Sequence, residues 1–274
     1  NNKYAALMDG GTKNRHSYYG SARFQLDVTP LEGLTVTGIF APKFTYRKNK
    51  NFTTQVPYWS SPDDLSSTSS NYISDATVTE LTEQRNDTFS HTTQFYANYQ
   101  KTFGQNHNFS AMIGYENYWY EEEGLQASNS SFPHSLIPYL SAGGTDAVTA
   151  ESNNVYELAR RSYFGRVMYN YANKYYVQGN IRRDGSSRFA PDHRWGTFLS
   201  ASAGWVFTQE KFLAGAKNWL DFGKLRVSYG QLGNERIQGY YPYQATLTPA
   251  YGVGYVGNNV TAIPGYSQTA AVIS

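Results

Sequence analysis

Apolar and polar residues alternate with a period of two in several long runs, and this alternation constrains the fold more than any other feature of the sequence. In residues 17–29 the even positions carry apolar side chains, such as Phe24 and Leu26, while the odd positions are mainly polar. The same parity returns in residues 34–46, after the Pro-Leu-Glu-Gly turn at residues 30–33. Because successive side chains of a strand point to opposite faces, each run predicts a strand with one apolar face, and the two strands form a hairpin.

Three further pairs of runs show the same pattern and bring the number of predicted strands to eight. They lie at residues 89–103 with 109–119, 163–171 with 175–181, and 199–207 with 225–229. Parity also predicts a register: if Tyr171 and Tyr175 pair across the turn at residues 172–174, Arg166 lies opposite Asn180 on the polar face. The sequence therefore predicts an all-β, antiparallel fold.

The amino-acid composition excludes several classes of function. The 274 residues include 23 Lys and Arg against 21 Asp and Glu, and this net charge of +2 excludes a strongly basic nucleic-acid binder. No apolar run reaches about 18 residues, which excludes a membrane-spanning helix but does not exclude a membrane-spanning barrel. The absence of cysteine excludes disulfide scaffolds, thiolate metal sites and cysteine nucleophiles, and leaves the compartment open.

The connections between the predicted strands alternate between short and long. Short ones lie at residues 30–33, 104–108 and 172–174, and long polar ones at residues 48–87, 121–160, 184–194 and after Asn234. Short turns at one end and long loops at the other are typical of bacterial outer-membrane barrels, whose strands need about 9–11 residues to cross the hydrocarbon layer. Aromatic residues gather near strand ends, as interfacial girdles do, and we predict that Trp195 and Trp205 anchor the two ends of one strand.

Two other folds share this alternation. A soluble sandwich or lipocalin-like barrel would turn the apolar face towards a protein core, and an eight-stranded barrel complete in itself would fill its interior with side chains. Two loops of roughly 40 residues argue against a compact soluble domain. The chain begins without Met or a signal segment and ends in a loop-like stretch, so we expect a fragment, with frayed ends of a complete domain as the alternative.

Three ordered motifs carry a family resemblance. The segment R-R-D-G-S-S-R-F-A-P-D-H-R-W-G-T-F at residues 182–198 resembles the signature of SusC/RagA-type TonB-dependent transporters, and so does S-Y-F-G-R-V-M-Y-N-Y at residues 162–171. The third is K-L-R-V-S-Y-G-Q-L-G-N at residues 224–234, followed by G-Y-Y-P-Y at residues 239–243. Leu199 stands where the family often has Pro, and Gly204 stands where Ala is common; both differences concern local packing.

The resemblance implies a central run of about eight strands, plus the start of a ninth, from a plugged transmembrane β-barrel of about 22 strands. Residues 1–274 would then be a partial barrel domain without plug, TonB box or C-terminal closing strand. The implied function is import of oligosaccharides, or secondly peptides, across the outer membrane of a Gram-negative bacterium. The implied partners are a SusD-like surface lipoprotein, TonB–ExbB–ExbD, outer-membrane lipid and the glycan or peptide substrate, with no nucleic acid. The alternative is a secreted soluble β-domain that acts as an adhesin or glycan-binding module.

Within the motifs, charge and glycine chemistry suggest structural roles. Arg182, Asp184 and Arg188 are predicted to form charge-assisted hydrogen bonds that pin the following loop, and Gly185 to supply a turn residue with positive φ; the alternative is that the charges are simply solvated. The other motif residues for which a structural role is expected are Arg183, Phe189, Trp195, Gly196, Tyr229 and Gly230. The polar face is predicted to carry Arg23, Lys43, Gln94, Asn98, Arg166, Asn170, Gln178, Asn180, Ser200, Ser202 and Arg226.

Aromatic residues in the predicted loops are the candidates for substrate binding, because a sugar ring stacks on a flat aromatic face. They are Tyr58, Trp59, Phe132, Tyr139, Tyr240, Tyr241 and Tyr243, and the alternative is that they only pack the loops or contact the lid. No catalytic, metal or cofactor site is expected. The five histidines are scattered, the acidic run at residues 121–123 suits a solvated rim better than a Ca²⁺ site, and the G-x-G-x-x-G match at residues 252–257 lacks a following helix.

Overall fold

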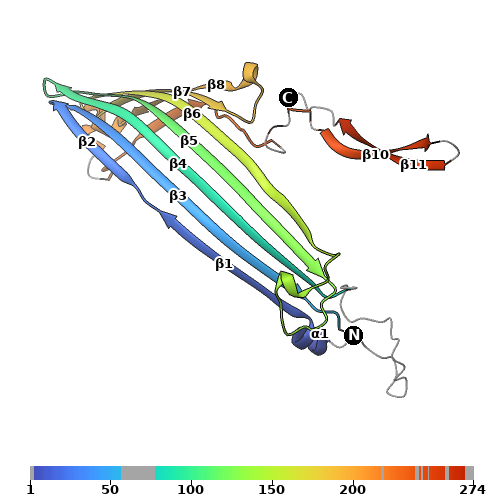
Figure 1. Ribbon diagram of the computed structural model, residues 1–274. Helices are drawn as coiled ribbons and strands as arrows, with labels where there is room; N and C mark the ends of the chain where they lie inside the picture. Colours follow the sequence, from blue (N-terminus) through green and yellow to red (C-terminus); the bar gives the residue numbers. More distant parts are fainter. Residues whose placement is uncertain are drawn as a thin grey trace. The chain divides into compact units, whose positions relative to one another are not determined.

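The computed structural model describes residues 3–56, 78–216, 219–237, 241, 243–245, 247–256 and 259–268, and these residues are mostly β-strand (Figure 1). The longer elements are α1 (Lys3–Asp9), β1 (Gly11–Ser21), β2 (Phe24–Leu31), β3 (Leu34–Thr53), β4 (Glu80–Phe103), β5 (His107–Ser130), β6 (Thr149–Tyr171), β7 (Tyr175–Ser186), β8 (Trp195–Trp205), β9 (Leu225–Gly230), β10 (Leu247–Val256) and β11 (Asn259–Gln268). Short 3₁₀ turns are η1 (Leu140–Ala142), η2 (Pro191–His193), η3 (Phe207–Gln209) and η4 (Lys211–Ala216). Among the described residues, no helix is long and apolar enough to cross a membrane.

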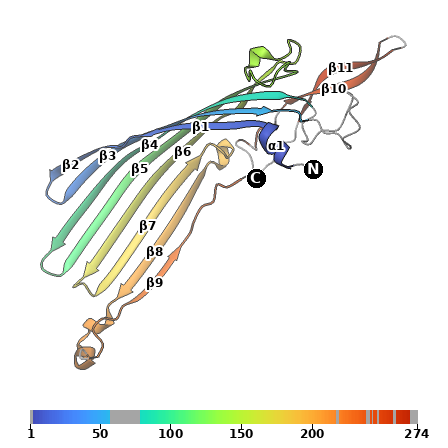
Figure 2. The same cartoon turned by 90° about the horizontal axis from the view of Figure 1, so that it is seen from below.

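The main sheet follows the chain from strand to strand, in the order β1-β3-β4-β5-β6-β7-β8-β9, with β2 also paired to β3 (Figures 1 and 2). The single strand predicted at residues 17–29 is therefore divided into β1 and β2, which pair with successive parts of β3. The break lies opposite Pro42, whose carbonyl accepts the Ala22 N–H at 3.0 Å. Proline has no N–H to donate to the ladder, which explains the interruption there.

The chain divides into two compact units, each defined by its internal contacts. The first comprises Asn1–Ala22, Pro42–Ser90 and Tyr120–Glu157, and the second Arg23–Ala41, His91–Trp119 and Leu158–Ser274.

In the second unit, the predicted register is confirmed. Tyr171 pairs with Tyr175 across the short turn, which places Arg166 opposite Asn180. The turn is held by Ala172 and Asn173, which both have positive φ, and the Asn170 side chain accepts the Asn173 N–H at 2.8 Å. Since β8 continues the same register, the two faces of β6, β7 and β8 stay distinct from strand to strand.

The apolar face of this unit is exposed to its surroundings. Val177, Ile181 and Leu199 are each about half exposed, at 57%, 50% and 52%. Aromatic side chains mark both ends of this face: Tyr163 stacks on Trp195 with ring centroids 5.9 Å apart, and Tyr171 stacks on Tyr175 at 6.3 Å. Trp195 and Trp205 begin and end β8, a separation of about 33 Å along an extended strand. This is the aromatic distribution that the sequence predicts.

In the first unit the strands are longer than predicted. The expected loops at residues 48–87 and 121–160 are shortened from both sides, because β3 runs to Thr53, β4 starts at Glu80, β5 runs to Ser130 and β6 starts at Thr149. The acidic run at residues 121–123 accordingly lies inside β5. These extensions carry polar residues on both faces, so they lack the apolar periodicity that identifies strands, while their backbones remain in the ladder.

A row of polar side chains crosses five strands of this unit. Arg15 Nε donates to Asn49 Oδ1 at 3.0 Å, and Asn49 Nδ2 donates to Gln84 Oε1 at 3.1 Å. Gln84 donates in turn to Gln126, whose Nε2 lies 3.4 Å from Glu151 Oε1. Such rows of amides satisfy one another laterally and stabilise the sheet where apolar pairs are absent.

Residues 131–148, which follow β5, fold back over the first unit. Phe132 packs edge-on against the buried Phe52, with ring centroids 5.4 Å apart. The buried Asn129 donates from Nδ2 to the Leu140 carbonyl at 2.6 Å. Lys50 Nζ lies 4.6 Å from the centre of the Tyr139 ring. These contacts hold the segment against β3 and the end of β5.

After β9 the chain contains elements that the sequence did not predict. Residues beyond Asn234 were expected to form a loop, but β10 and β11 make a separate two-stranded antiparallel sheet. The G-x-G-x-x-G match begins in β10, so it follows neither a parallel strand nor the geometry of a dinucleotide site. Helix α1 was likewise not predicted, since its seven residues are too few to show a periodicity.

Glu210 fastens the connection after β8 to the turn between β6 and β7. Its carboxylate accepts hydrogen bonds from the Tyr175 hydroxyl at 2.5 Å, from the Trp205 indole N–H at 3.0 Å and from Lys174 Nζ at 3.1 Å. These hydrogen bonds lower the pKa of Glu210 from 4.5 to about 2, and the bond from Tyr175 has the largest effect.

We expect this carboxylate to make the stability of the protein depend on pH below 4.5. Because its pKa is lower in the folded state, its contribution is complete above 4.5 and is lost as the pH falls towards about 2. Thermal unfolding of the purified full-length protein, followed by circular dichroism from pH 7 to 2, should show a smaller acid-induced loss for Glu210→Gln than for the wild type. Glu32→Gln, at the β2–β3 turn, is the matched control. Identical pH profiles for wild type and Glu210→Gln would contradict this prediction.

Candidate functional site

The candidate site is the polar face of the second unit. The strand register places seven of the predicted inward residues on this face: Arg166, Asn170, Gln178, Asn180, Ser200, Ser202 and Arg226. On the neighbouring strands, Gln94 donates to Glu116 and Ser110 donates to Asn98. The prediction of a shared face is confirmed for the residues of β6 to β9.

The remaining two predicted inward residues have local partners. Arg23 lies between β1 and β2 and donates to the Gln25 side chain at 2.9 Å. Lys43 lies in the first unit, with its Nζ 5.2 Å from the centre of the Tyr19 ring. Neither residue is part of the hollows described next.

A charged hollow of about 830 Å³ lies on the polar face near the β7–β8 connection. Arg182 is its central residue: Nε donates to both oxygens of Asp184, at 2.7 and 3.0 Å, and one terminal nitrogen donates to Ser162 Oγ at 2.9 Å. The same nitrogen lies 3.3 Å from Glu116 Oε1, and Gln94 donates to the other oxygen of Glu116 at 2.5 Å. The Arg182 guanidinium is thus fixed between two carboxylates.

Other arginines tie the adjoining loops to this hollow. Arg160 forms an ion pair with Glu235 at 3.0 Å, and its guanidinium lies 4.4 Å from the centre of the Tyr118 ring. Arg188 does not join Arg182 and Asp184 as predicted; it donates to the Glu235 carbonyl at 3.5 Å. Arg194 Nε donates to the Phe189 carbonyl at 3.1 Å. The loop is therefore pinned, but largely by arginines outside the predicted trio.

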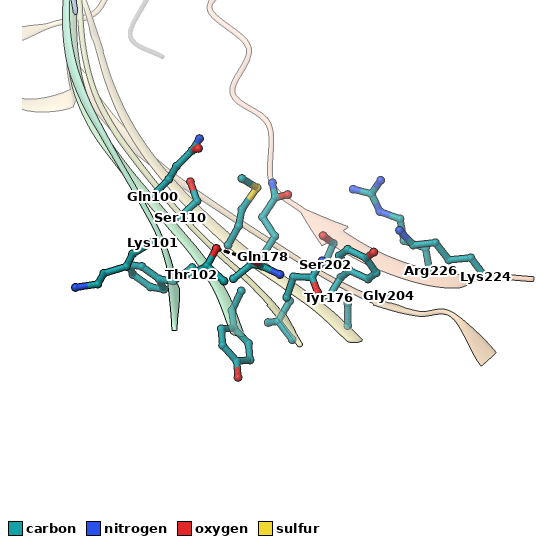
Figure 3. A pocket seen from close by; sticks show the side chains of 17 residues that line it. Gln100, Lys101, Thr102, Ser110, Tyr176, Gln178, Ser202, Gly204, Lys224 and Arg226 are labelled. Atoms are coloured by element: carbon teal, nitrogen blue, oxygen red, sulfur yellow. Dashed lines mark hydrogen bonds between the residues drawn. The ribbon is translucent and has the colours of Figure 1, made fainter. Parts of the chain in front are cut away.

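A cationic hollow of about 500 Å³ lies on the same face towards the short turns (Figure 3). Gln178, Ser202 and Arg226 line it, together with Lys224, whose Nζ lies 4.0 Å from the centre of the Tyr176 ring. Its lining residues include no Asp or Glu. At Gly204 a Cβ atom would lie 3.2 Å from Lys224 Cε, so the glycine leaves room for the lysine stem.

Glycine 185 has a different role from the one predicted. Positive φ occurs at other described glycines, and Gly185 instead lies within β7, opposite Trp195. The indole covers it so closely that a Cβ atom would lie 2.9 Å from the ring. Gly185 thus makes room for an interfacial aromatic side chain rather than for a turn.

The other motif residues are divided between the two faces. Arg183 lies on the apolar face, with its guanidinium 5.5 Å from the centre of the Trp195 ring, and Tyr229 lies there opposite Ala201. Gly230 lies opposite Ser200 on the polar face, where Gly196 is covered by the Phe198 ring.

Among the described residues, the aromatic candidates are divided between the two units. Tyr58, Trp59 and Tyr240 lie outside the described residues. Phe132 and Tyr139 lie in the first unit, in the contacts given above. Tyr241 and Tyr243 lie in the second unit, with rings edge-on at 6.2 Å, and the Tyr243 hydroxyl accepts from Arg194 at 3.4 Å.

Sequence reasoning missed four contributors to the hollows: Glu116, Arg160, Glu235 and Lys224. Parity could have identified Glu116, because it shares its parity in β5 with Ser110 on the polar face. Glu235 follows the last strand of the sheet, and its contact with Arg160 joins residues far apart in the sequence. No local signal predicts such a contact.

Comparison with known proteins identifies the class of this fold. The RagAB peptide transporter structure matches 97% of this chain with a TM-score of 0.78 and 25% sequence identity, and an open-open structure of the RagAB peptide importer matches 99% with a TM-score of 0.80 and 24% identity. In each case the chain covers 27% of the matched chain. The sheet is thus an antiparallel segment of a transmembrane β-barrel of the TonB-dependent type, as predicted.

Sequence relatives make the assignment more specific. The chain is 34% identical to TonB-dependent receptor P39 of Formosa agariphila over 150 residues, 52% of this chain and 14% of the relative. It is 33% identical to TonB-dependent receptor SusC of Bacteroides thetaiotaomicron over 148 residues, 54% of this chain and 14% of the relative. No family model matches. The predicted resemblance to SusC/RagA-type TonB-dependent transporters is confirmed, and the match spans a small part of these relatives' length.

Two glycines of β7 provide a test of the Trp195 contact. Gly185→Ala should lower the free energy of unfolding by about 1–3 kcal/mol, because the new methyl group displaces the indole. Gly179→Ala is the matched control, since a Cβ atom there meets nothing within 4 Å. Thermal unfolding of both full-length variants measures the difference. Equal stabilities would show that the indole contact with Gly185 is not a packing constraint.

Proposed function

We propose that this chain forms part of the barrel wall of a TonB-dependent transporter in the outer membrane of a Gram-negative bacterium. The observation that carries the proposal is the two-faced sheet of the second unit: its polar face bears two hollows, and its apolar face ends in aromatic rows. A sheet of this kind fits between lipid on one side and a water-filled lumen on the other. The polar face would then line the path of the substrate.

The activity belongs to the full-length protein. In this proposal residues 1–274 are a partial barrel domain, and the plug, the TonB box and the closing strand come from other parts of the protein. A SusD-like surface lipoprotein captures the substrate with the outer loops, and TonB–ExbB–ExbD supplies the energy that moves the plug. The protein acts by transport and not by catalysis.

Oligosaccharides are the proposed substrates. Half-buried amides and hydroxyls on the polar face, such as Gln178, Asn180 and Ser202, suit the many hydroxyl groups of a sugar. Peptides are the second candidate, because the matched RagAB structures are named as a peptide transporter and importer. Uptake assays in the native bacterium, with and without the intact protein, should separate the two when mixed oligosaccharides and mixed oligopeptides are offered in turn.

Electrophoresis of outer membranes tests the proposal at its base. An antibody against this segment should detect a heat-modifiable species much larger than the 30.8 kDa of this chain. A soluble species near 30.8 kDa would contradict it and favour the secreted adhesin or glycan-binding module.

Two residues of β8 allow the two faces to be compared. In the full-length protein, Ser202→Leu should reduce the rate of substrate uptake at least about fivefold, because a bulky apolar group enters the cationic hollow. Thr197→Leu is the matched control, since Thr197 pairs with Arg183 on the apolar face, lines neither hollow and should leave uptake unchanged. Radiolabelled substrate uptake by whole cells measures both. A larger loss for Thr197→Leu would reverse the assignment of the faces.

The aromatic candidates in the described part of the second unit can be tested separately. If the Tyr243 ring stacks on the substrate, Tyr243→Ala should raise the half-saturation concentration for uptake at least about fivefold with little change in the maximal rate. Tyr243→Phe keeps the ring, loses the hydroxyl that accepts from Arg194, and should behave as the wild type. Equal impairment of the two variants would show that the hydroxyl, and not the ring, matters. Tyr241→Ala gives an independent reading at the neighbouring ring.

A further inference from the structure

Two arginines lie on the apolar face of the second unit. The register places Arg161 opposite Gly185 and Arg183 opposite Tyr163, so the two side chains emerge from adjacent strands on the face that carries Tyr163 and Trp195. Both residues are exposed. They lie at the end of the sheet that bears the longer β7–β8 connection, at the level of one aromatic row.

These arginines differ from those of the polar face in their partners. Arg160 and Arg182 each lie against a carboxylate. In the part of the chain that the structure describes, neither Arg161 nor Arg183 forms an ion pair, and the contact of Arg183 is with the Trp195 ring. An exposed pair of guanidinium groups beside an indole is therefore available to an anion, and the guanidinium fork matches a phosphate group particularly well.

An apolar groove of about 860 Å³ begins next to this pair. Ile181 and Leu199 face each other two residues beyond Arg183, and both line the groove. Farther along lie Val167, Gly179 and Ala201, which form one row across β6, β7 and β8. At Gly179 a Cβ atom would meet nothing within 4 Å, so the groove is open there. Its shape and lining suit a hydrocarbon chain.

We propose that Arg161 and Arg183 bind the phosphate of an acylated, phosphorylated glycolipid, and that one of its acyl chains lies in the groove. The inference rests on the proposed function, in which the apolar face contacts the outer membrane. We propose a glycolipid and not a phospholipid because the arginines lie at the end of the sheet with the longer β7–β8 connection. The longer connections of such barrels face the cell exterior, where the outer leaflet is built from phosphorylated glycolipid. Charge complementarity with the two arginines positions the phosphate of the headgroup, and the apolar groove positions the acyl chain.

Lipid analysis of the purified full-length protein tests this site. The protein is extracted in mild detergent and washed, and its bound glycolipid is counted by native mass spectrometry and by assays of phosphate and fatty acids. The wild type should retain about one glycolipid per protein, and Arg161→Gln/Arg183→Gln should retain at least about tenfold less. Gly179→Leu should also lose it, because the new side chain fills the groove. Lys101→Gln should retain the glycolipid, because Lys101 is an exposed cation near the end of β4 at Phe103, away from the arginine pair.

The outcomes separate this site from the proposed function. Equal glycolipid in the wild type and the double arginine variant overturns the site, as does a phospholipid in its place. If the protein is heat-modifiable and imports substrate but carries no glycolipid, the site alone is wrong. If the protein is soluble and not heat-modifiable, the proposed function fails first. Retention by wild type and Lys101→Gln, with loss in the other two variants, supports the site.

Discussion

Everything on the two faces depends on the register between neighbouring strands. Side chains alternate along a strand with a period of two, so a slip by one residue would exchange the polar and apolar faces completely. In β6, β7 and β8 one row joins Arg166, Asn180 and Ser200, and the next row joins Val167, Gly179 and Ala201. The short turn at residues 172–174 sets this register for β6 and β7, since Tyr171 pairs with Tyr175. A single pairing thus determines which side chains can meet a solute and which can meet lipid.

The sequence predicts the fold best where the two environments differ. In β6 to β9, water on one side and apolar surroundings on the other leave a clear alternation, and the strands, the faces and the pairing of Arg166 with Asn180 could all be predicted. In the first unit the extensions of β3, β4, β5 and β6 lack this alternation, as the polar row from Asn49 to Glu151 illustrates, so the sequence predicts loops where the structure has strands. Backbone hydrogen bonds hold a strand whatever its side chains, so hydropathy cannot mark the ends of such a strand.

The candidate site was predictable only where its contacts are local. Arg182 and Asp184 are two residues apart in one strand, share a face, and form the predicted pair. The contact of Arg182 with Glu116 depends on the stagger between strands that are distant in the sequence, and no motif states that stagger. Gly185 shows a second limit: a glycine provides either positive φ or room for a neighbour, and only the position of the Trp195 ring distinguishes the two uses.

The two hollows on the polar face differ in what they can offer to a solute. In the charged hollow, Arg182 is held by Asp184 and Glu116, so most of its hydrogen-bonding capacity is already used within the wall. In the cationic hollow, Arg226 and Lys224 line the surface with no carboxylate among the lining residues, and Lys224 lies against an aromatic ring. A group with a partial or full negative charge is therefore attracted more strongly to the cationic hollow than to the charged hollow. If the polar face lines the path of the substrate, as proposed, the wall selects by charge mainly at the cationic hollow, because cations that are already paired with carboxylates attract a solute less.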